Sequence, residues 1–402
     1  MRLSRAWAVA IALLFIQTTS SGLGFYNMSV YVSEFAPYLG VTVASISLAV
    51  SFFFIAGGVT GLVVSRWIDR VDIRWLMCGG AVIGGVALAL MALANNLWQI
   101  YALFLLFGVG NTTVSLVVGT TLIARWFPGA NRSIAMSIAF TGLSLGGVLL
   151  TPLSAYLFAE IGVAATMPWI GLMFVALTVP LILGVISMPP AEAAPGGASH
   201  IEPEYRRAIA MPLFRYMTAG YILCMASQVG GIAHLYGRVE VISDFATASM
   251  AVQALSIGSI LGRFVGGVLA TRINVRLFTL YVLGVQFCGL ASLGLAPTPT
   301  VAILAAGLMG MGVGNLLMSQ PLWLAYEFPA DIYPRVFALA NALSVIGVAS
   351  GPLIMGLIVD WSGHRGAFAF ASGLSTLGGV LFLLAIRFPR YEAQELSIPD
   401  ED

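Results

Sequence analysis

The chain has 402 residues, of which 59% are apolar and only 9% are charged, and its formal net charge is +1 at pH 7. A typical soluble domain carries about 25% charged residues, so this composition excludes a soluble enzyme, a nucleic-acid-binding protein and a disordered protein. The mean hydropathy of +0.96 indicates a chain whose solvent is lipid.

Apolar stretches long enough to cross a bilayer recur along the whole chain. A helix needs about 20 apolar residues to span the hydrocarbon core, and these stretches do not alternate in polarity as barrel strands do, so we predict an all-α membrane protein. The first stretch runs past the length of a signal-peptide core, and we interpret it as a retained helix. In chain order the twelve predicted spans are 6–32, 43–65, 75–94, 98–124, 133–158, 164–187, 212–236, 246–270, 276–296, 299–325, 335–359 and 366–387.

The 18 basic residues are all arginine, and their distribution tests this count of spans. If the N-terminus is cytoplasmic, 15 of the 18 fall in cytoplasmic segments, Arg238 and Arg365 fall in outer loops, and Arg263 falls within span eight. This asymmetry follows the positive-inside rule for an even number of spans with both termini in the cytoplasm. The Arg-only, Ala- and Gly-rich composition further suggests a bacterial inner membrane.

The two halves of the chain resemble each other at an offset close to 200. Gly110-Asn111 in span four matches Gly314-Asn315 in span ten, and residues 69–74 match residues 271–276. Parallel six-helix repeats are typical of a large transporter class whose substrate site lies between the halves. The predicted units are an N-terminal bundle (1–187), a solvated cytoplasmic linker (188–211), a C-terminal bundle (212–390) and a tail (391–402).

The loop after span two reads SRWIDRVDIR over residues 65–74 and resembles the G-x-x-x-D-R-x-G-x-R motif of the major facilitator superfamily. Ser65 and Asp72 replace the two glycines of the motif. The resemblance covers all twelve spans, and it implies that a loop carboxylate caps a neighbouring helix and latches the outward-open state. Alternatively, the loop arginines only set the topology. The implied gating residues are Asp69, Arg70 and Arg74, with Arg272 and Arg276 in the second half.

Within that superfamily the chain looks most like the monocarboxylate porter and oxalate–formate exchanger branch. The similarity rests on RWFP (125–128), on an R-x-x-A-x-x-I-A-x-x-G pattern from Arg132 to Gly142, and on the arginine in span eight. In that branch this arginine binds the substrate carboxylate, and a carboxylate one turn earlier takes part in proton coupling, where this chain has Ser259. Span eleven lacks the lysine of the oxalate–formate exchanger, which argues against a dianionic substrate.

Arg263 is therefore the first candidate for a substrate ligand. An arginine within a span costs about 3 kcal/mol or more and usually faces a cavity or a partner, and its planar guanidinium suits a carboxylate. The alternative is a snorkelling arginine, which would have to reach roughly 10 Å to the cytoplasmic end of the helix.

Other polar residues fall at helical spacing within the spans and are further candidates for the substrate site. Such residues either line a cavity or bond neighbouring helices, and we favour packing for Asn111. The additional substrate-binding candidates are Asn27 and Tyr31 in span one, Gln228 in span seven, and Asn315 and Trp323 in span ten.

Proton coupling requires a group that titrates near neutral pH. His234, at the outer end of span seven, and Glu34, at the outer end of span one, are the candidates, although both are more simply placed at the water interface without a special role. Because no carboxylate falls inside a predicted span, anion exchange and uniport remain alternatives to proton symport.

We expect a secondary transporter that moves a small organic monocarboxylate by alternating access, as a monomer, with no cofactor, metal or nucleic-acid partner. Efflux of amphipathic drugs is the rival within the same class, and a membrane sensor on a transporter fold is a remote alternative. An enzyme or an ATP-driven pump is disfavoured because the spans contain no cluster of His, Asp or Glu and the sequence has no Walker motif.

Overall fold

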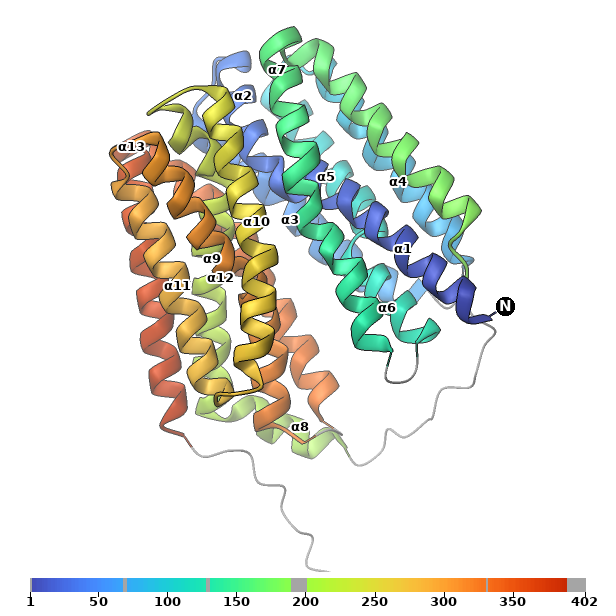
Figure 1. The fold of residues 1–402 in the computed structure, drawn as a ribbon, viewed down its shortest axis with the longest axis vertical. Helices are drawn as coiled ribbons and strands as arrows, with labels where there is room; N and C mark the ends of the chain where they lie inside the picture. The colour runs from blue at the N-terminus through green and yellow to red at the C-terminus, as the bar shows by residue number, and fades with distance from the viewer. Residues whose placement is uncertain (1, 68–70, 128–130, 189–200, 330–331, 389–402) are drawn as a thin grey trace, which may run out of the picture.

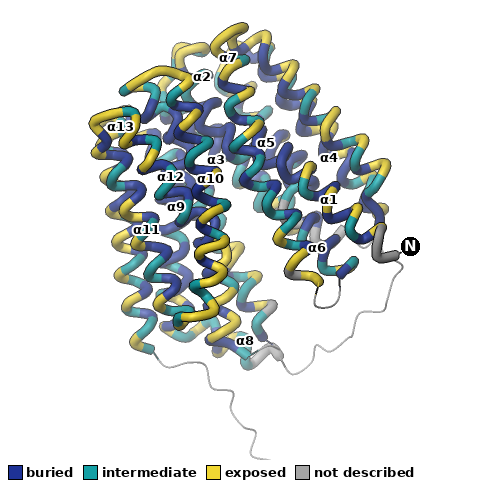
Figure 2. The backbone as a smooth tube through the Cα atoms, viewed as in Figure 1, coloured by how far each residue is buried: buried dark blue, intermediate teal, exposed yellow. Residues whose placement is uncertain are grey.

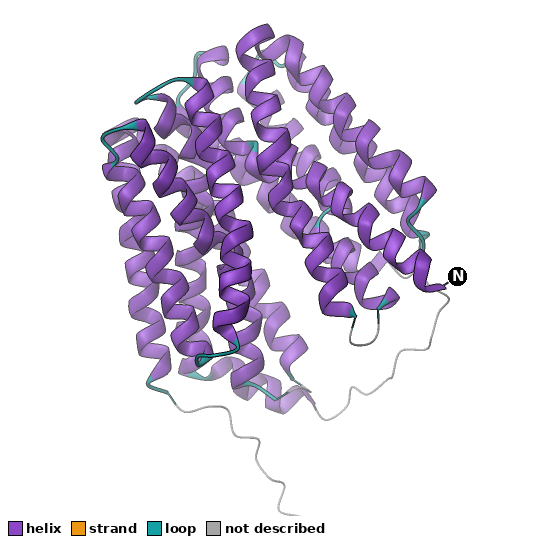
Figure 3. Ribbon diagram, in the orientation of Figure 1, coloured by secondary structure: helices purple, strands orange, loops and turns teal. Residues whose placement is uncertain are grey.

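A computed structural model describes residues 2–67, 71–127, 131–188, 201–329 and 332–388 of the chain. These residues are helical apart from short turns, and no strand occurs among them (Figure 3). The all-α prediction is thus confirmed.

The first half forms six spans, and several of them are built from more than one helical piece. Its elements are α1 (Arg2–Ser20), the π-helix η1 (Ser21–Tyr26), α2 (Met28–Leu39), α3 (Val43–Trp67), α4 (Ile73–Leu90), the 3-10 turn η2 (Met91–Leu93), α5 (Leu97–Val114), α6 (Leu116–Trp126) and α7 (Arg132–Gly184). Span one consists of α1, η1 and α2, and span four consists of α5 and α6.

The second half repeats this plan after a short connecting helix. Its elements are α8 (Ile201–Ala210), α9 (Pro212–Glu240), α10 (Phe245–Ala270), α11 (Val275–Leu295), α12 (Pro299–Glu327) and α13 (Tyr333–Ile386). Nine helices in the described part of the chain are long and apolar enough to cross a membrane, and α8 with α9, bent by 61°, supplies another such unit. Because α7 and α13 each contain two spans, the total is the predicted twelve.

Both double-length helices fold back at a glycine in the same relative position. Gly162 in α7 has φ 75° and ψ 173°, and Gly363 in α13 has φ 73° and ψ 176°. A positive φ of this kind is strained for residues that carry a Cβ atom. The offset of 201 between the two glycines places the outer hairpins of the two halves in register with the sequence repeat.

The loops after spans two and eight are duplicated as well. Asp72 accepts a hydrogen bond from the backbone N–H of Arg74, and Asn274 accepts one from that of Arg276, so each side chain caps the helix that follows it. The same capping geometry therefore occurs in both loops, although the capping residue is aspartate in one and asparagine in the other.

Small residues allow the helices of each half to approach closely. A Cβ atom added to Gly22 in η1 would lie 2.7 Å from the carbonyl oxygen of Gly146 in α7, so spans one and five touch through their backbones. Large apolar side chains face outward instead, with Trp98 80% and Trp361 87% exposed. Figure 2 shows this pattern of buried inner and exposed outer faces, which suits a lipid solvent.

The two halves meet at the end of the molecule opposite to the N-terminus and α8, and they diverge toward the end that carries these elements (Figure 1). Contacts between the halves join α3 to α13, α2 to α9 and α7 to α10. In this conformation the bundles are closed against each other at the end opposite the N-terminus, which we call the outer end after the predicted orientation, and the other end the inner end.

One part of the linker differs from the expected solvated segment. Residues 201–210 form α8, and the buried Ala208 packs with Leu213 and Phe214 in the core of the second half. Residues 189–200 of the predicted linker lie outside the described part of the chain.

Candidate functional site

Arg263 lies where α7 and α10 meet, in the interface between the two halves. Its side chain is half-buried, and its Nη1 donates a 2.7 Å hydrogen bond to the backbone carbonyl of Phe140 in α7. Arg263 forms no other hydrogen bond and no ion pair with a residue that the structure describes. Because a guanidinium has five N–H donors, most of its donor capacity is available to another ligand.

Two further polar contacts join α7 and α10 on the outer side of Arg263. The hydroxyl oxygens of Ser144 and Ser259 are 3.3 Å apart, and Nε2 of Gln253 donates a 3.0 Å hydrogen bond to the carbonyl of Val148. The two helices are antiparallel, so these contacts follow one another toward the outer end. The Arg263 contact is the innermost of the three.

The π-helix η1 lies against the same region and interrupts span one. Its Ser21 hydroxyl donates a 2.6 Å hydrogen bond to the carbonyl of Leu143 in α7, and its Tyr26 lies within electrostatic range of Arg263. Asn27, the next residue, is fully buried, and neither atom of its side-chain amide has a hydrogen-bond partner among the described residues. Buried polar atoms are normally satisfied and π-turns are frequent at functional sites, so this segment suits a ligand-binding role.

The paired asparagines of spans four and ten both join neighbouring helices. Asn315 donates a 2.7 Å hydrogen bond from Nδ2 to the carbonyl of Gly262, the residue before Arg263. Asn111 accepts a 2.8 Å hydrogen bond from the hydroxyl of Ser20, which is the interhelical bond expected of it. Asn315 therefore supports the helical turn that carries the arginine.

The other three predicted substrate ligands bond within their own half. Tyr31 donates a 2.9 Å hydrogen bond to a carbonyl of its own span, and Nε2 of Gln228 donates one of 2.9 Å to Gln286 on α11. Trp323 donates its N–H to a carboxylate on its own helix. All three side chains are 1% exposed or less, so this conformation does not bring them together with Arg263.

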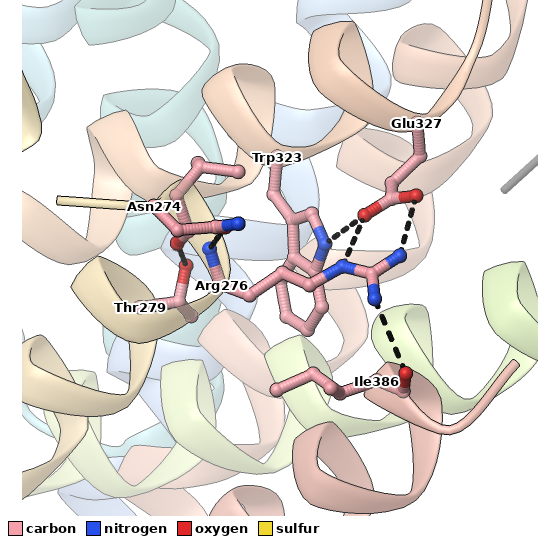
Figure 4. Close-up of polar contacts among 7 residues, drawn as sticks. Asn274, Arg276, Thr279, Trp323, Glu327 and Ile386 are labelled. Atoms are coloured by element: carbon pink, nitrogen blue, oxygen red, sulfur yellow. Dashed lines mark hydrogen bonds and ion pairs between the residues drawn. The ribbon is translucent and has the colours of Figure 1, made fainter. Parts of the chain in front are cut away.

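A charged cluster holds the inner ends of α11, α12 and α13 together (Figure 4). Arg276 donates from Nε and Nη2 to the two carboxylate oxygens of Glu327, at 2.8 and 3.0 Å, and from Nη1 to the carbonyl of Ile386 at 3.2 Å. Trp323 donates to the same carboxylate at 2.9 Å. The bidentate geometry makes this a strong pair.

Glu327 also corrects the expectation that no carboxylate is buried in a span. It is 2% exposed and ends α12, which runs two residues beyond the predicted limit of 325. Arg276 pairs with this carboxylate and offsets part of the cost of burying it.

The remaining predicted gating residues are only partly described. Arg74 donates a 2.7 Å hydrogen bond from Nε to the carbonyl of Ile186, at the inner end of span six, which parallels the contact of Arg276. The side chain of Arg272 is exposed. Asp69 and Arg70 lie outside the described residues, so the helix-capping role implied for Asp69 stays a prediction.

At the outer end a carboxylate of the second half caps a helix of the first. Oδ1 of Asp360 in α13 accepts a 3.1 Å hydrogen bond from the backbone N–H of Val43, and Oδ2 accepts one of 2.9 Å from that of Ala44. These two N–H groups begin α3, where the helix dipole favours an anion. The contact exists only while the outer ends are together.

His234 is buried between the halves, which corrects its expected position at the water interface. It is 1% exposed, and its Nε2 lies 3.0 Å from the carbonyl oxygen of Pro352 and 3.3 Å from the hydroxyl of Ser47. The packing of α3 and α13 over α9 covers the ring. Glu34, the other candidate for proton coupling, is half-buried near the same end.

Arg238, which we expected in an outer loop, is also buried. It is 2% exposed and donates to the carbonyls of Leu293, Gly294 and Ala296 at the end of α11. A cation at a helix C-terminus is stabilised by the exposed carbonyls. This arginine therefore anchors α9 to α11 and belongs to the packing of the second half.

Comparison with known proteins agrees with this architecture. The sequence model of the Major Facilitator Superfamily matches residues 14–327 and 208–401. The chain belongs to that superfamily. The nucleoside transporter NupG superposes with a TM-score of 0.78 at 13% identity, over 95% of this chain and 100% of that one. A bacterial homologue of the human lysosomal transporter Spinster, in an inward-facing conformation, gives 0.72 at 15% identity over 96% and 97%. At these identities the likeness concerns the fold.

The sequence similarity to known transporters extends over most of this chain. The MFS-type transporter pynF of Aspergillus niger is 26% identical over 95% of this chain and 88% of its own length. The multidrug resistance protein MdtG of Klebsiella pneumoniae is 22% identical over 97% and 96%. The agnestins efflux protein AgnL12 of Paecilomyces divaricatus is 24% identical over 79% and 72%. This chain is accordingly an integral multi-pass membrane protein of a family that transports small molecules.

Proposed function

We propose that this superfamily member is a secondary transporter for a small organic monocarboxylate, which binds Arg263 between the two halves. The supporting observation is a guanidinium that lies within a span, one to two helical turns from its inner end, bonds across to the other half, and has only one backbone carbonyl as a partner among the described residues. A charge this costly in a membrane is retained where a ligand or pathway requires it. Asn27, with its unpartnered amide, is the nearest further candidate for a contact to the substrate.

The chemistry of the site favours a carboxylate over a cation. Phe140 uses one donor of Arg263, and the remaining donors suit a bidentate carboxylate. Ser259, one turn away, is neutral, so no fixed anion competes for the guanidinium from that position. Span eleven (335–359) contains no lysine, which is in keeping with a single negative charge on the substrate.

Transport would follow from alternation between this conformation and one that is closed at the inner ends. We place α8 and both termini in the cytoplasm, in accord with the distribution of arginine, so the conformation described here gives access from the cytoplasm. The transporter would act as a monomer in a bacterial inner membrane. Proton symport, anion exchange and uniport are the possible modes of coupling.

Efflux of amphipathic drugs is the second candidate, and the names of two relatives favour it. MdtG is a multidrug resistance protein and AgnL12 is an efflux protein. An apolar compound would not depend on a guanidinium, so the two candidates differ in the role they give to Arg263.

The test compares Arg263→Gln and Arg263→Lys with the wild type in proteoliposomes. We expect both variants to lose uptake of small carboxylates and to lose the thermal stabilisation that a bound carboxylate gives, because neither side chain offers the bidentate donor pair. A loss of about 2.8 kcal/mol would weaken binding roughly a hundredfold. Arg365→Gln removes an exposed outer arginine and serves as the control.

Near-normal carboxylate transport by Arg263→Gln would rule out the proposed carboxylate site. If the wild type instead exports a lipophilic dye and Arg263→Gln does so equally well, drug efflux is the better assignment.

A further inference from the structure

A second cluster of titratable groups lies at the outer end of the interface, away from Arg263. Ser33 in α2, from the first half, donates a hydrogen bond to Oε2 of Glu240, the last residue of α9 in the second half. Glu34 follows Ser33 and is close enough to Glu240 for the two carboxylates to repel each other. Two acidic groups from different halves are thus brought together by the closure of the outer ends.

In the part of the chain that the structure describes, no cation pairs with either carboxylate. Neither Glu34 nor Glu240 forms an ion pair with a residue in the described part of the chain, and the nearby Arg238 is bonded to carbonyls of α11 instead. Like charges that share a partly buried site cannot both ionise without a cost. The cost falls on the closed conformation, because opening separates the halves.

A cavity of about 120 Å³, lined by Glu240 and by Ser33 next to Glu34, gives space for water. Residues of both halves line it, and two of them are histidines. Its lining includes Ser29, Ser33, His234, Gly237, Glu240 and His364. Water in this space would connect the carboxylates to the outer medium.

The other charged and titratable groups at this end are engaged elsewhere or exposed. Asp360 caps α3, and Asp244 caps its own helix α10. Arg365 is exposed, and Tyr236 is buried on α9 with its hydroxyl unpartnered among the described residues. The two histidines that line the cavity are therefore the main competitors of the carboxylates as a pH-sensitive group.

We propose that Glu34, which faces Glu240 across the interface, binds one proton when the outer ends close and releases it when they open. Closure forms an O–H bond on one carboxylate oxygen with a proton from the outer water, and opening returns that proton to the same water. This site deepens the proposed function by adding regulation of the outer gate. It rests on alternating access but not on the identity of the substrate.

The sign of the pH dependence follows from linkage. The closed conformation binds one proton more tightly than the open one, so low pH favours closure and rising pH favours opening. For a single proton, the ratio of open to closed molecules changes at most tenfold per pH unit.

The experiment measures the outer gate directly and needs no substrate. Spin labels on Tyr38→Cys and Ser243→Cys, in a background without the native cysteines, lie on different halves at exposed outer positions. Their distance distribution is recorded from about pH 5 to 9, the range over which a carboxylate raised from its usual pKa titrates. We expect the long-distance population to grow with pH in the wild type.

The variants identify the group that responds. Glu34→Gln and Glu240→Gln should each stay closed at high pH and lose most of the pH response, whereas Glu160→Gln, an exposed outer carboxylate, should keep it. Each variant is accepted only if it elutes as a monodisperse protein. His234→Gln and His364→Gln test the competing histidines.

A wild type without a pH response, or a response that survives both glutamate variants, would overturn the proposal. So would a response abolished only by the histidine variants. Because the distances are measured without substrate, failure of the carboxylate site at Arg263 leaves this test unaffected.

Discussion

Asp360→Asn should shift the transporter toward a conformation that is open at the outer end. The carboxylate of Asp360 accepts hydrogen bonds from Val43 and Ala44 at 3.1 and 2.9 Å and interacts with the positive end of the α3 dipole. Helix caps and charges at helix ends contribute about 1–2 kcal/mol each in favourable cases. Because this contact joins the halves, its loss destabilises only the closed conformation, and the closed-to-open ratio should fall roughly 5- to 30-fold.

The assay is the rate at which a polar thiol reagent, added from the outside, labels Ser51→Cys. Ser51 lies on α3 two turns inside the outer end and is 3% exposed, so it reacts when the outer end opens. Asp244→Asn is the matched control, since Asp244 accepts a hydrogen bond from the backbone N–H of Thr247 and caps α10 within one half. If Asp360→Asn is labelled no faster than the wild type, the carboxylate does not hold the outer end closed.

Two further predictions concern stability and topology. Glu327→Gln should lower the unfolding free energy by about 3 kcal/mol, because it leaves Arg276 without its charged partner. The measurement is unfolding in detergent at neutral pH. A loss of stability no larger than that of Glu160→Gln would contradict the role of the pair. Cysteines at Ser199→Cys and Thr298→Cys should be labelled from opposite sides of the membrane, and labelling from the same side would refute the proposed orientation.

The fold was predictable because two independent patterns constrain it. The lengths of the apolar stretches predicted the spans, and the repeat near an offset of 200 matched each span of the first half to one of the second. The structure bears out that pairing at Gly162 and Gly363, which turn the two outer hairpins with nearly identical dihedral angles. Both patterns can be recognised from the sequence alone, without knowledge of tertiary contacts.

Contacts between the halves were not predictable in the same way. The burial of His234 depends on helices that are far from it in the chain, and its sequence position at the end of a span suggested water instead. The partner of Arg263 is a backbone carbonyl, which carries no signature in the sequence. Glu327 had a weak signal, since it precedes Phe328-Pro329 where the first half has Trp126 before Phe127-Pro128.

Two charged contacts of this structure have no match at the repeated positions of the other half. The repeat places Ala159 opposite Asp360 and Trp126 opposite Glu327. Alanine and tryptophan carry no carboxylate, so neither the cap of α3 nor the pair with Arg276 can recur at these positions. If the two similar bundles alternate as proposed, these unmatched charges bias which end is closed. Asp360 joins the halves at the outer end and weights this conformation toward closure there, whereas the parallel repeat by itself leaves the two ends distinct. Under the proposed function, one site between the two bundles would need one counter-charge, which fits the absence of a basic residue opposite Arg263 in span two.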